Sequence, residues 1–106
     1  MKGGTLLALT LLCLSFGPAQ AWELMIAFTG DLHASLPRLA ALEPLLREAD
    51  LVLDAGDAWE DLYRLTGLPE ALATARRMGE LGYQAMVLGN HEMYLGPALR
   101  EVIAAA

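Results

Sequence analysis

Apolar residues form three short runs along the chain, and a glycine beside an aspartate or asparagine follows each run. The first run extends from Trp22 to Thr29, the second from Leu51 to Leu53, and the third from Ala85 to Leu88. Short, nearly continuous apolar runs are typical of strands in a parallel sheet that is covered on both faces. The pattern therefore predicts three buried strands.

A helix is predicted between the first two runs because leucines recur there at helical spacing. Their positions are Leu36, Leu39, Leu42 and Leu46. Ser35 can cap this helix, and Pro37 is tolerated because amides in the first turn lack partners within the helix. Pro44 predicts that the helix is kinked or divided into two.

A second helix is predicted to open at Pro69 and to end at Gly82, which suits the left-handed conformation that often follows a helix. Its buried stripe would consist of Leu72, Ala75, Met78 and Leu81. Residues 58–67 predict a loop or a short helical turn, and Gly96-Pro97 introduces a last helix. Strands that alternate with helices predict the α/β class, in the order βαβαβα with a parallel sheet.

Five polar residues stand shortly after the predicted strands: Asp31, His33, Asp57, Asn90 and His91. The carboxyl ends of parallel strands lie at one edge of a sheet, which is where α/β proteins bind ligands. The chain contains no other histidine and no other asparagine. The topology therefore brings together rare polar residues that are far apart in the sequence.

This set of carboxylates, imidazoles and one amide matches the ligands of a hard or borderline divalent metal ion. A carboxylate such as Asp57 can bridge two cations, and metals about 3.5–4 Å apart both activate water and stabilise a leaving oxygen. The alternative is that these residues only form turns or cap helices, which is what we expect of Asp54. Because capping does not require histidine, the five residues together favour a metal site.

Residues 1–21 have the pattern of a secretory signal peptide. Lys2 supplies a positive start, residues 6–16 an apolar stretch, and Ala19-Gln20-Ala21 a cleavage site. The apolar stretch is shorter than the about 20 residues that a membrane span needs, so a stable anchor is not expected. We therefore predict export to the periplasm or the extracellular space after cleavage near Ala21, with residues 22–106 as the folded domain.

The composition of residues 22–106 narrows the class of partner. They contain neither cysteine nor lysine, and loss of Lys2 takes the formal charge of the chain from -6 to -7. The lack of cysteine excludes a disulfide framework in the exported domain. An acidic domain is a poor partner for nucleic acid, which is bound through basic patches, but it is suited to binding cations.

Three motifs in order, Asp31-Leu32-His33, Gly56-Asp57 and Gly89-Asn90-His91-Glu92, resemble the first three motifs of the calcineurin-like metallophosphoesterases. The Gly-Asn-His-Glu form together with an export signal is most similar to the secreted 5′-nucleotidase branch. The resemblance covers residues 24–96 and implies the amino-terminal half of a metallophosphoesterase-type α/β sandwich, that is, a truncated domain. It also implies a hydrolase that acts on a small phosphate ester such as a nucleotide.

The resemblance implies a role for each residue and two divalent metal ions, which could be Mn, Zn, Fe or Mg. Asp31 and His33 would bind the first metal, Asp57 would bridge both, and Asn90 would bind the second. His91 would protonate the leaving alkoxide or steady the transferred phosphoryl group while a metal-bound hydroxide attacks phosphorus. The alternative for His91 is a structural histidine that is bonded to the backbone.

The chain departs from the family pattern in two respects. Tyr94 stands where the 5′-nucleotidases commonly keep an aspartate that orients the histidine. Glu60 is a candidate for this orienting carboxylate, and the alternative is a solvated loop residue. The family takes further metal-binding histidines from later strands, which this chain lacks, so the protein would supply only Asp57 and Asn90 to the second metal.

These considerations predict a metal-dependent phosphoesterase that is inactive or weakly active as this chain alone. Two alternatives stay open, namely a non-enzymatic truncated remnant and a secreted α/β domain that binds a cation or a small ligand. A sheet of three strands also has open edges, which invite self-association. The motifs encode neither the substrate nor the oligomeric state.

Overall fold

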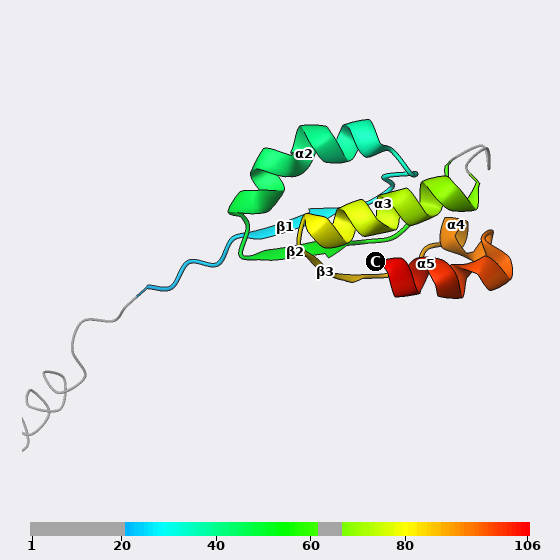
Figure 1. Cartoon of the computed structure of the whole chain (residues 1–106). Coiled ribbons are helices and arrows are strands. Elements are labelled where there is room, and N and C mark those ends of the chain that lie inside the picture. Colours follow the sequence, from blue (N-terminus) through cyan, green and yellow to red (C-terminus); the bar gives the residue numbers. More distant parts are fainter. Residues whose placement is uncertain (1–20, 62–66) are drawn as a thin grey trace, which may run out of the picture.

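The computed structural model describes residues 21–61 and 67–106, so residues 1–20 of the expected signal peptide and residues 62–66 of the expected loop lie outside the described part. Three short strands form one parallel sheet in the order β1 (Ile26–Thr29), β2 (Leu51–Asp54) and β3 (Tyr83–Met86) (Figure 1). The predicted α/β class and the parallel sheet are confirmed.

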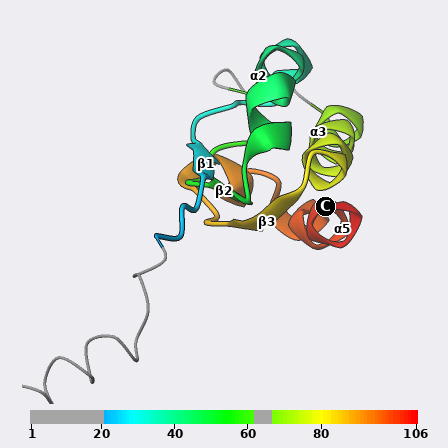
Figure 2. The same cartoon turned by 90° about the vertical axis from the view of Figure 1, so that its left-hand side faces the viewer.

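Helices connect the strands and follow the last one. α2 (Leu36–Glu48) joins β1 to β2, and α3 (Leu68–Glu80) leads into β3. After β3 come the short helix α4 (Asn90–Met93), the 3-10 helix η1 (Gly96–Ala98) and α5 (Leu99–Ala105). α2 and α3 cover one face of the sheet, and α5 packs against α3 beside β3 (Figure 2). Within residues 21–61 and 67–106, no helix is long and apolar enough to span a membrane.

The three strands end level with one another at the edge where the polar loops begin. Thr29 at the end of β1 is paired with Asp54 at the end of β2, and Asp54 is paired with Met86 at the end of β3. The pairing of β2 with β3 is irregular next to Val52, whose amide donates a hydrogen bond to the side-chain oxygen of Gln84 at 2.8 Å. The loops after the strands therefore start at the same level, as the topology predicted.

The local sequence explains where α2 and α3 begin and end. Ser35 Oγ accepts a hydrogen bond from the Arg38 amide at 3.4 Å, so Ser35 caps α2 as predicted. The Gly67 amide before α3 donates to Glu70 Oε2 at 3.0 Å. Gly82 follows α3 with a φ of 85°, a left-handed conformation that glycine adopts without a Cβ clash. The predicted end of the second helix is thus confirmed.

The apolar core lies between the sheet and its helices. Its buried members are Leu32, Leu39, Leu46, Val52, Ala58, Trp59, Ala71, Ala75, Met78, Leu81 and Val102. The predicted core position of Met78 is confirmed, whereas Leu72 packs against the core but is only partly buried. Val102 anchors α5 to the same cluster. The core therefore holds the helices, and through Leu32, Ala58 and Trp59 it also anchors the loops at the carboxyl end of the sheet.

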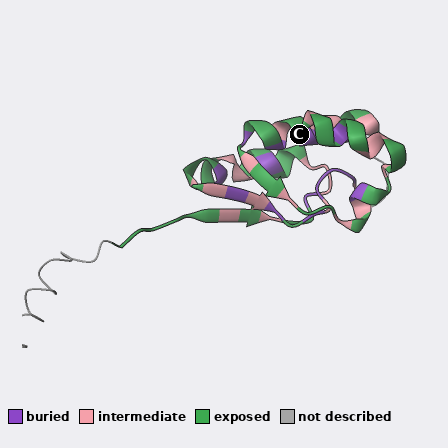
Figure 3. Cartoon of the chain, turned by 90° about the horizontal axis from the view of Figure 1, so that it is seen from below, coloured by how far each residue is buried: buried purple, intermediate pink, exposed green. Residues whose placement is uncertain are grey.

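The prediction that the strands are covered on both faces is wrong for β1. This strand begins at Ile26 rather than Trp22, and its residues alternate between exposed and partly buried (Figure 3). Ala27 packs against the core, whereas Ile26 is exposed and Phe28 is 76% exposed. The reason is that the helices cover one face of the sheet, and no element within the described residues covers the other.

β3 also differs from the prediction in its position. It covers Tyr83–Met86 rather than Ala85–Leu88, and the last two residues of the expected strand are exposed. The strand begins early because Tyr83 belongs to the sheet, where its hydroxyl lies 2.8 Å from Thr29 Oγ1 of β1. β3 starts with Tyr83 and Gln84, which do not belong to the apolar run, so the run did not mark the beginning of the strand.

Of the two outcomes predicted at Pro44, a kink or a division of the first helix, the structure excludes the division. α2 is continuous from Leu36 to Glu48 although Pro44 cannot donate the hydrogen bond to the Ala40 carbonyl. Ala40 and Pro44 are both exposed, so solvent can take the place of the missing donor. Leu39 and Leu46 hold the two ends of α2 in the core, and this packing outweighs the local cost of proline.

Candidate functional site

Two loops at the carboxyl end of the sheet carry backbone strain. Among the described residues, the non-glycine positions with positive φ are Asp31 (54°), His33 (49°), Ala34 (55°) and Asp57 (57°). An L-residue in this left-handed region costs about 1–2 kcal/mol, and such strain gathers at functional sites. Three of these residues are predicted metal ligands, so the strain and the predicted chemistry coincide.

Backbone hydrogen bonds hold the loop after β1 against the loop after β2. The Asp31 amide donates to the Gly56 carbonyl at 3.0 Å. The His33 amide donates to the Asp57 carbonyl at 2.9 Å. The two loops thus continue the parallel pairing of the strands beyond the sheet, which brings Asp31, His33 and Asp57 to neighbouring places.

The loop after β3 approaches Asp57 so closely that only glycine fits there. A Cβ at Gly89 would overlap the Asp57 carboxylate. Asp57 Oδ1 accepts a hydrogen bond from the His91 amide at 2.8 Å. Asp57 therefore caps the start of α4 from a neighbouring loop, and one of its carboxylate oxygens has a fixed position.

Glu92 lies at the centre of the contact between the loops after β2 and β3. Its side chain is fully buried, and its Oε1 accepts hydrogen bonds from the amides of Ala58 at 2.6 Å and Trp59 at 3.0 Å. Its Oε2 accepts from the amides of Asp57 at 2.9 Å and Gly89 at 2.7 Å. One carboxylate thus satisfies four backbone donors from two loops.

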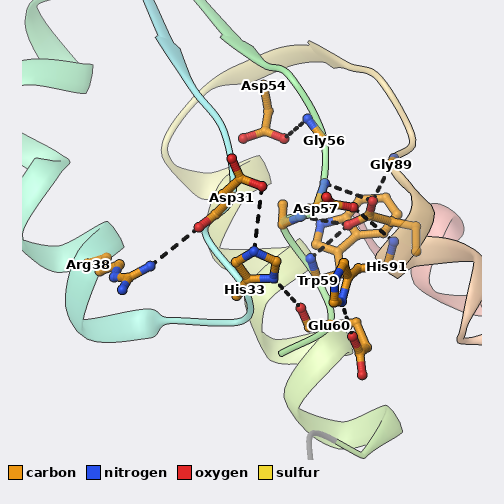
Figure 4. A network of polar contacts seen from close by, with 12 residues as sticks. Asp31, His33, Arg38, Asp54, Gly56, Asp57, Trp59, Glu60, Gly89 and His91 are labelled. Atoms are coloured by element: carbon orange, nitrogen blue, oxygen red, sulfur yellow. Dashed lines mark hydrogen bonds and ion pairs between the residues drawn. The ribbon is translucent and has the colours of Figure 1, made fainter. Parts of the chain in front are cut away.

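Glu60 contacts both histidines (Figure 4). Its buried carboxylate oxygen Oε2 lies 2.7 Å from His91 Nδ1, and its carbonyl oxygen lies 3.1 Å from His33 Nδ1. The two imidazole rings meet edge to face with their centroids 4.8 Å apart. The burial of Glu60 beside His91 excludes the alternative of a solvated loop residue.

The surroundings of His91 favour its protonated form. The hydrogen bond to Glu60 raises the pKa of His91, and the nearby Asp57 carboxylate acts in the same direction, although partial burial opposes both. The Tyr94 ring also meets the His91 ring edge to face, with centroids 5.1 Å apart. Glu60 is therefore an acidic partner of His91, and the Tyr94 ring packs against the same imidazole.

Asp31 and Asn90 are the most accessible of the predicted ligands. The Asp31 side chain is 77% exposed, and its Oδ1 lies 3.5 Å from His33 Nε2. Its carbonyl oxygen accepts a hydrogen bond from Arg38 Nη1 at 3.3 Å. Asn90, the first residue of α4, is exposed as well. Solvent therefore reaches the site from the side of these two residues.

The predicted ligands do not form a preassembled metal site. In the part of the chain that the structure describes, no group of three or more His, Cys, Asp or Glu side chains is placed to hold a metal ion. The donor types nevertheless fit a divalent cation, because carboxylates, imidazoles and amide oxygens all bind such ions. The Asp31 side chain is 77% exposed, so it is not packed into the core. In residue type, the predicted ligands thus fit a divalent metal ion.

Asp54 stays outside this group. Its buried carboxylate accepts hydrogen bonds from the Gly56 amide at 2.8 Å and from the Thr29 hydroxyl at 2.6 Å. Burial raises the pKa of Asp54. The bond to Gly56 is the predicted turn role, and the bond to Thr29 adds a link between β2 and β1.

Sequence reasoning assigned no role to Glu92. A signal was present, because an acidic residue at the third position of a helix often bonds back to the amide at the start of that helix. The bond from Gly89 to Glu92 is of this kind. The three bonds to the loop after β2 had no local signal, since Ala58 is 34 positions away from Glu92 along the chain.

Comparisons with known proteins agree with the motifs. The model of the calcineurin-like phosphoesterase family matches residues 24–103. The trifunctional nucleotide phosphoesterase YfkN of Bacillus subtilis is 35% identical over 85 residues, which cover 74% of this chain and 6% of that protein. The 5′-nucleotidase of Mus musculus is 34% identical over an aligned stretch of 126 residues, and this stretch covers 92% of this chain and 22% of that protein. The 5′-nucleotidase of Bos taurus is 34% identical over 113 residues, which cover 79% and 20%.

The chain thus spans about a fifth of the length of the mammalian relatives it matches. No solved structure matches it. The family match includes all three motifs of the sequence, and the structure brings these motifs to one edge of a parallel sheet. The similarity to mammalian 5′-nucleotidases extends over most of the chain and indicates the 5′-nucleotidase-like branch. This chain therefore belongs to the calcineurin-like phosphoesterase family.

Proposed function

We propose that the chain provides a metal-dependent phosphoesterase site of the 5′-nucleotidase type, which hydrolyses a small phosphate ester such as a nucleotide. The observation that carries this proposal is the position of Asp57, whose carbonyl accepts a hydrogen bond from His33 and whose carboxylate accepts one from His91, so that it joins the loops of all three motifs. A ligand that is already fixed loses little entropy on binding. The relatives are a nucleotide phosphoesterase and 5′-nucleotidases, which supports a nucleotide as the substrate class.

Two divalent metal ions would be bound by residues of the three motifs. Asp31 and His33 would hold the first ion, Asn90 the second, and Asp57 would lie between them. Bound cations would polarise the phosphoryl oxygens and lower the pKa of a bound water. The exposure of Asp31 and Asn90 leaves room for a phosphate ester to approach from solvent.

His91 would act on the leaving oxygen of the ester. Glu60 contacts Nδ1 of the ring at 2.7 Å, so Nε2 is the nitrogen that remains for the substrate. The same contact raises the pKa of His91 and favours the protonated ring, which is the form that can give a proton to an alkoxide. Glu60 would therefore be a positioning residue that selects the tautomer and holds the ring.

Cation binding without turnover is the second candidate function. It is favoured because backbone hydrogen bonds hold the loops of Asp31, His33 and Asp57 together, whereas only Asp57 and Asn90 are proposed for a second ion. In that case Asp31, His33 and Asp57 would bind a single cation, and His91 would have no catalytic role. The two functions differ in one measurable property, the turnover of a phosphate ester.

The test compares the purified chain with its His91→Ala and Glu60→Gln variants on a nucleoside monophosphate and an aryl phosphate, with excess Mn²⁺. General acid catalysis contributes about 10²–10⁴-fold, so His91→Ala should lower kcat by that factor and Glu60→Gln by a smaller one. Calorimetry should show little change in Mn²⁺ binding, since neither residue is a proposed ligand. Activity unchanged in His91→Ala would contradict the mechanism, and Mn²⁺ binding without turnover in the wild type would support the second candidate.

Export and self-association complete the proposal. The pattern of residues 1–21 supports export, and the open edges of β1 and β3 support self-association. Mass spectrometry of secreted material should find a chain that starts at Trp22, whereas intact chain in the membrane fraction would contradict export.

Light scattering tests the proposed self-association. It should show a mass that rises with concentration, and a constant monomer mass would contradict self-association.

A further inference from the structure

Backbone amides occupy the hydrogen-bond acceptor sites of the Glu92 carboxylate. A carboxylate has about four lone-pair sites. The amides that occupy them in Glu92 belong to Asp57, Ala58, Trp59 and Gly89. Because the side chain is also fully buried, Glu92 has no lone pair left for a metal ion or a substrate, although it belongs to the third motif.

Glu92 and Asp57 bind each other's loops reciprocally. Glu92 Oε2 accepts from the Asp57 amide at 2.9 Å, and Asp57 Oδ1 accepts from the His91 amide at 2.8 Å. Gly89 permits this close approach because a Cβ there would overlap the Asp57 carboxylate. The reciprocal bonds fix the Asp57 side chain relative to the first turn of α4, where Asn90 is located.

Asp57 needs this support because its backbone is strained. Its φ is 57°, and a strained residue persists only where the surrounding structure over-determines it. On the side of the loop after β1, the His33 amide donates to the Asp57 carbonyl at 2.9 Å. On the side of the loop after β3, the hydrogen bond from the Asp57 amide to Glu92 provides the matching restraint. Without the carboxylate, four amides would need other partners.

We propose that Glu92 is a positioning residue whose carboxylate holds the loops after β2 and β3 in the arrangement that aims Asp57 and Asn90 at a shared divalent cation. The metal part of this inference rests on the proposed function, whereas the clamp itself stands on the four hydrogen bonds. Glu92 acts on the metal only through the two ligands that it positions.

The test uses Glu92→Gln, which keeps the shape of the side chain but replaces one oxygen by an amide group that faces two N–H donors. Calorimetry should show that Mn²⁺ affinity falls about 10–100-fold, the loss that is typical of outer partners of metal sites. Amide hydrogen exchange should accelerate at Asp57, Ala58, Trp59 and Gly89, while α3 keeps its protection. Unchanged Mn²⁺ affinity in this variant would overturn the proposal.

Val102→Ala is the matched control, because Val102 is equally buried but belongs to the apolar core. Both variants are measured at a temperature at which their melting curves show the folded state. A merely structural role of Glu92 would weaken Mn²⁺ binding equally in the two variants, and this result would overturn the proposal. A loss of affinity confined to Glu92→Gln would support it.

The wild-type chain provides a test that does not depend on whether Glu92→Gln folds. The four amides that Glu92 binds should exchange about tenfold or more slowly than those of the exposed residues 22–24, the protection expected from a bond to a charged acceptor. Equally fast exchange would overturn the clamp. Slow exchange in a chain that binds no Mn²⁺ would overturn the proposed metal function, and with it the metal role of Glu92, and leave a structural clamp.

Discussion

The loops after β1 and β2 both carry predicted metal ligands, yet they are held in different ways. Residues 55–61 after β2 are largely buried, and the Glu92 carboxylate binds three of their amides. Residues 30–35 after β1 are bound to that loop through backbone hydrogen bonds, and the Asp31 side chain is 77% exposed. Folding thus fixes the loop after β2 more firmly than the Asp31 side chain in the loop after β1.

The two loops therefore differ in whether folding or ligand binding would order the aspartate side chain that they carry. Folding fixes Asp57, and buried hydrogen bonds to a charged acceptor, worth about 1.5–3 kcal/mol each, offset its backbone strain. Asp31 would instead lose side-chain freedom on binding the proposed metal, at a cost of at most about 2 kcal/mol. Substitutions that touch Asp57 should therefore damage both folding and binding, whereas substitutions at Asp31 should damage binding alone.

The largest effect is expected for Gly89→Ala, which forces a Cβ onto the Asp57 carboxylate. Overpacking of this kind costs about 1–3 kcal/mol, so the free energy of unfolding from urea denaturation should fall by that amount, and Mn²⁺ binding should be lost. The control is Gly30→Ala in the loop after β1, where the new Cβ would meet Ala55 Cβ at an ordinary 3.5 Å. Equal losses in the two variants would remove the contrast between the loops.

A smaller effect, measured on Mn²⁺ binding, separates the two aspartates. Asp57→Asn should weaken Mn²⁺ binding by more than the about 10–100-fold that loss of an outer partner costs, because Asp57 is the proposed bridging ligand. Asp31→Asn should weaken it about tenfold less than Asp57→Asn, since wild-type binding already includes the cost of ordering this exposed side chain. Calorimetric titration of both variants measures the difference. A greater loss in Asp31→Asn would reverse our interpretation of the two loops.

The smallest effect concerns Asp54, which joins β1 to β2 where the two loops begin. Burial raises the pKa of Asp54, so the folded state holds this proton more tightly than the unfolded chain does. Its contribution to stability is fully present below the unfolded pKa of about 3.9 and is lost as the pH rises through the folded-state pKa. Compared with Asp54→Asn, which has no such proton, the wild type should lose stability as the pH rises across this range.

Urea midpoints of both proteins over a series of pH values measure this loss. The titration of groups far from Asp54 is common to the two chains, so the difference between their midpoints reports Asp54 and the charges next to it. A difference that does not change with pH would mean that the buried Asp54 carboxylate is as well stabilised as it is in water.

Local periodicity in the sequence was sufficient to predict the architecture. Apolar runs and helically spaced leucines depend only on neighbours along the chain, so the parallel α/β order could be predicted and is confirmed. The common location of Asp31, Asp57 and Asn90 followed from topology, because parallel strands end at one edge of the sheet. Their roles as metal ligands stay predictions.

The covering of the strands depended on tertiary structure. Phe28 is as apolar as a buried strand residue, and only the position of the helices decides that it faces solvent. Pro44 carries the local signal of a helix break, yet the burial of Leu39 and Leu46 on either side of it keeps α2 continuous. In both cases a non-local contact, or its absence, outweighs the local pattern.

The sequence by itself determined the family, the fold class and the set of candidate ligands, because these depend on residue type and order. Only the tertiary structure decided how the site is held together. Glu92 binds amides that lie 33 to 35 positions away along the chain, and Glu60 reaches His91 across 31 positions. Such contacts form because a buried carboxylate must find hydrogen-bond donors wherever the fold supplies them, and no spacing in the sequence records which donors those are.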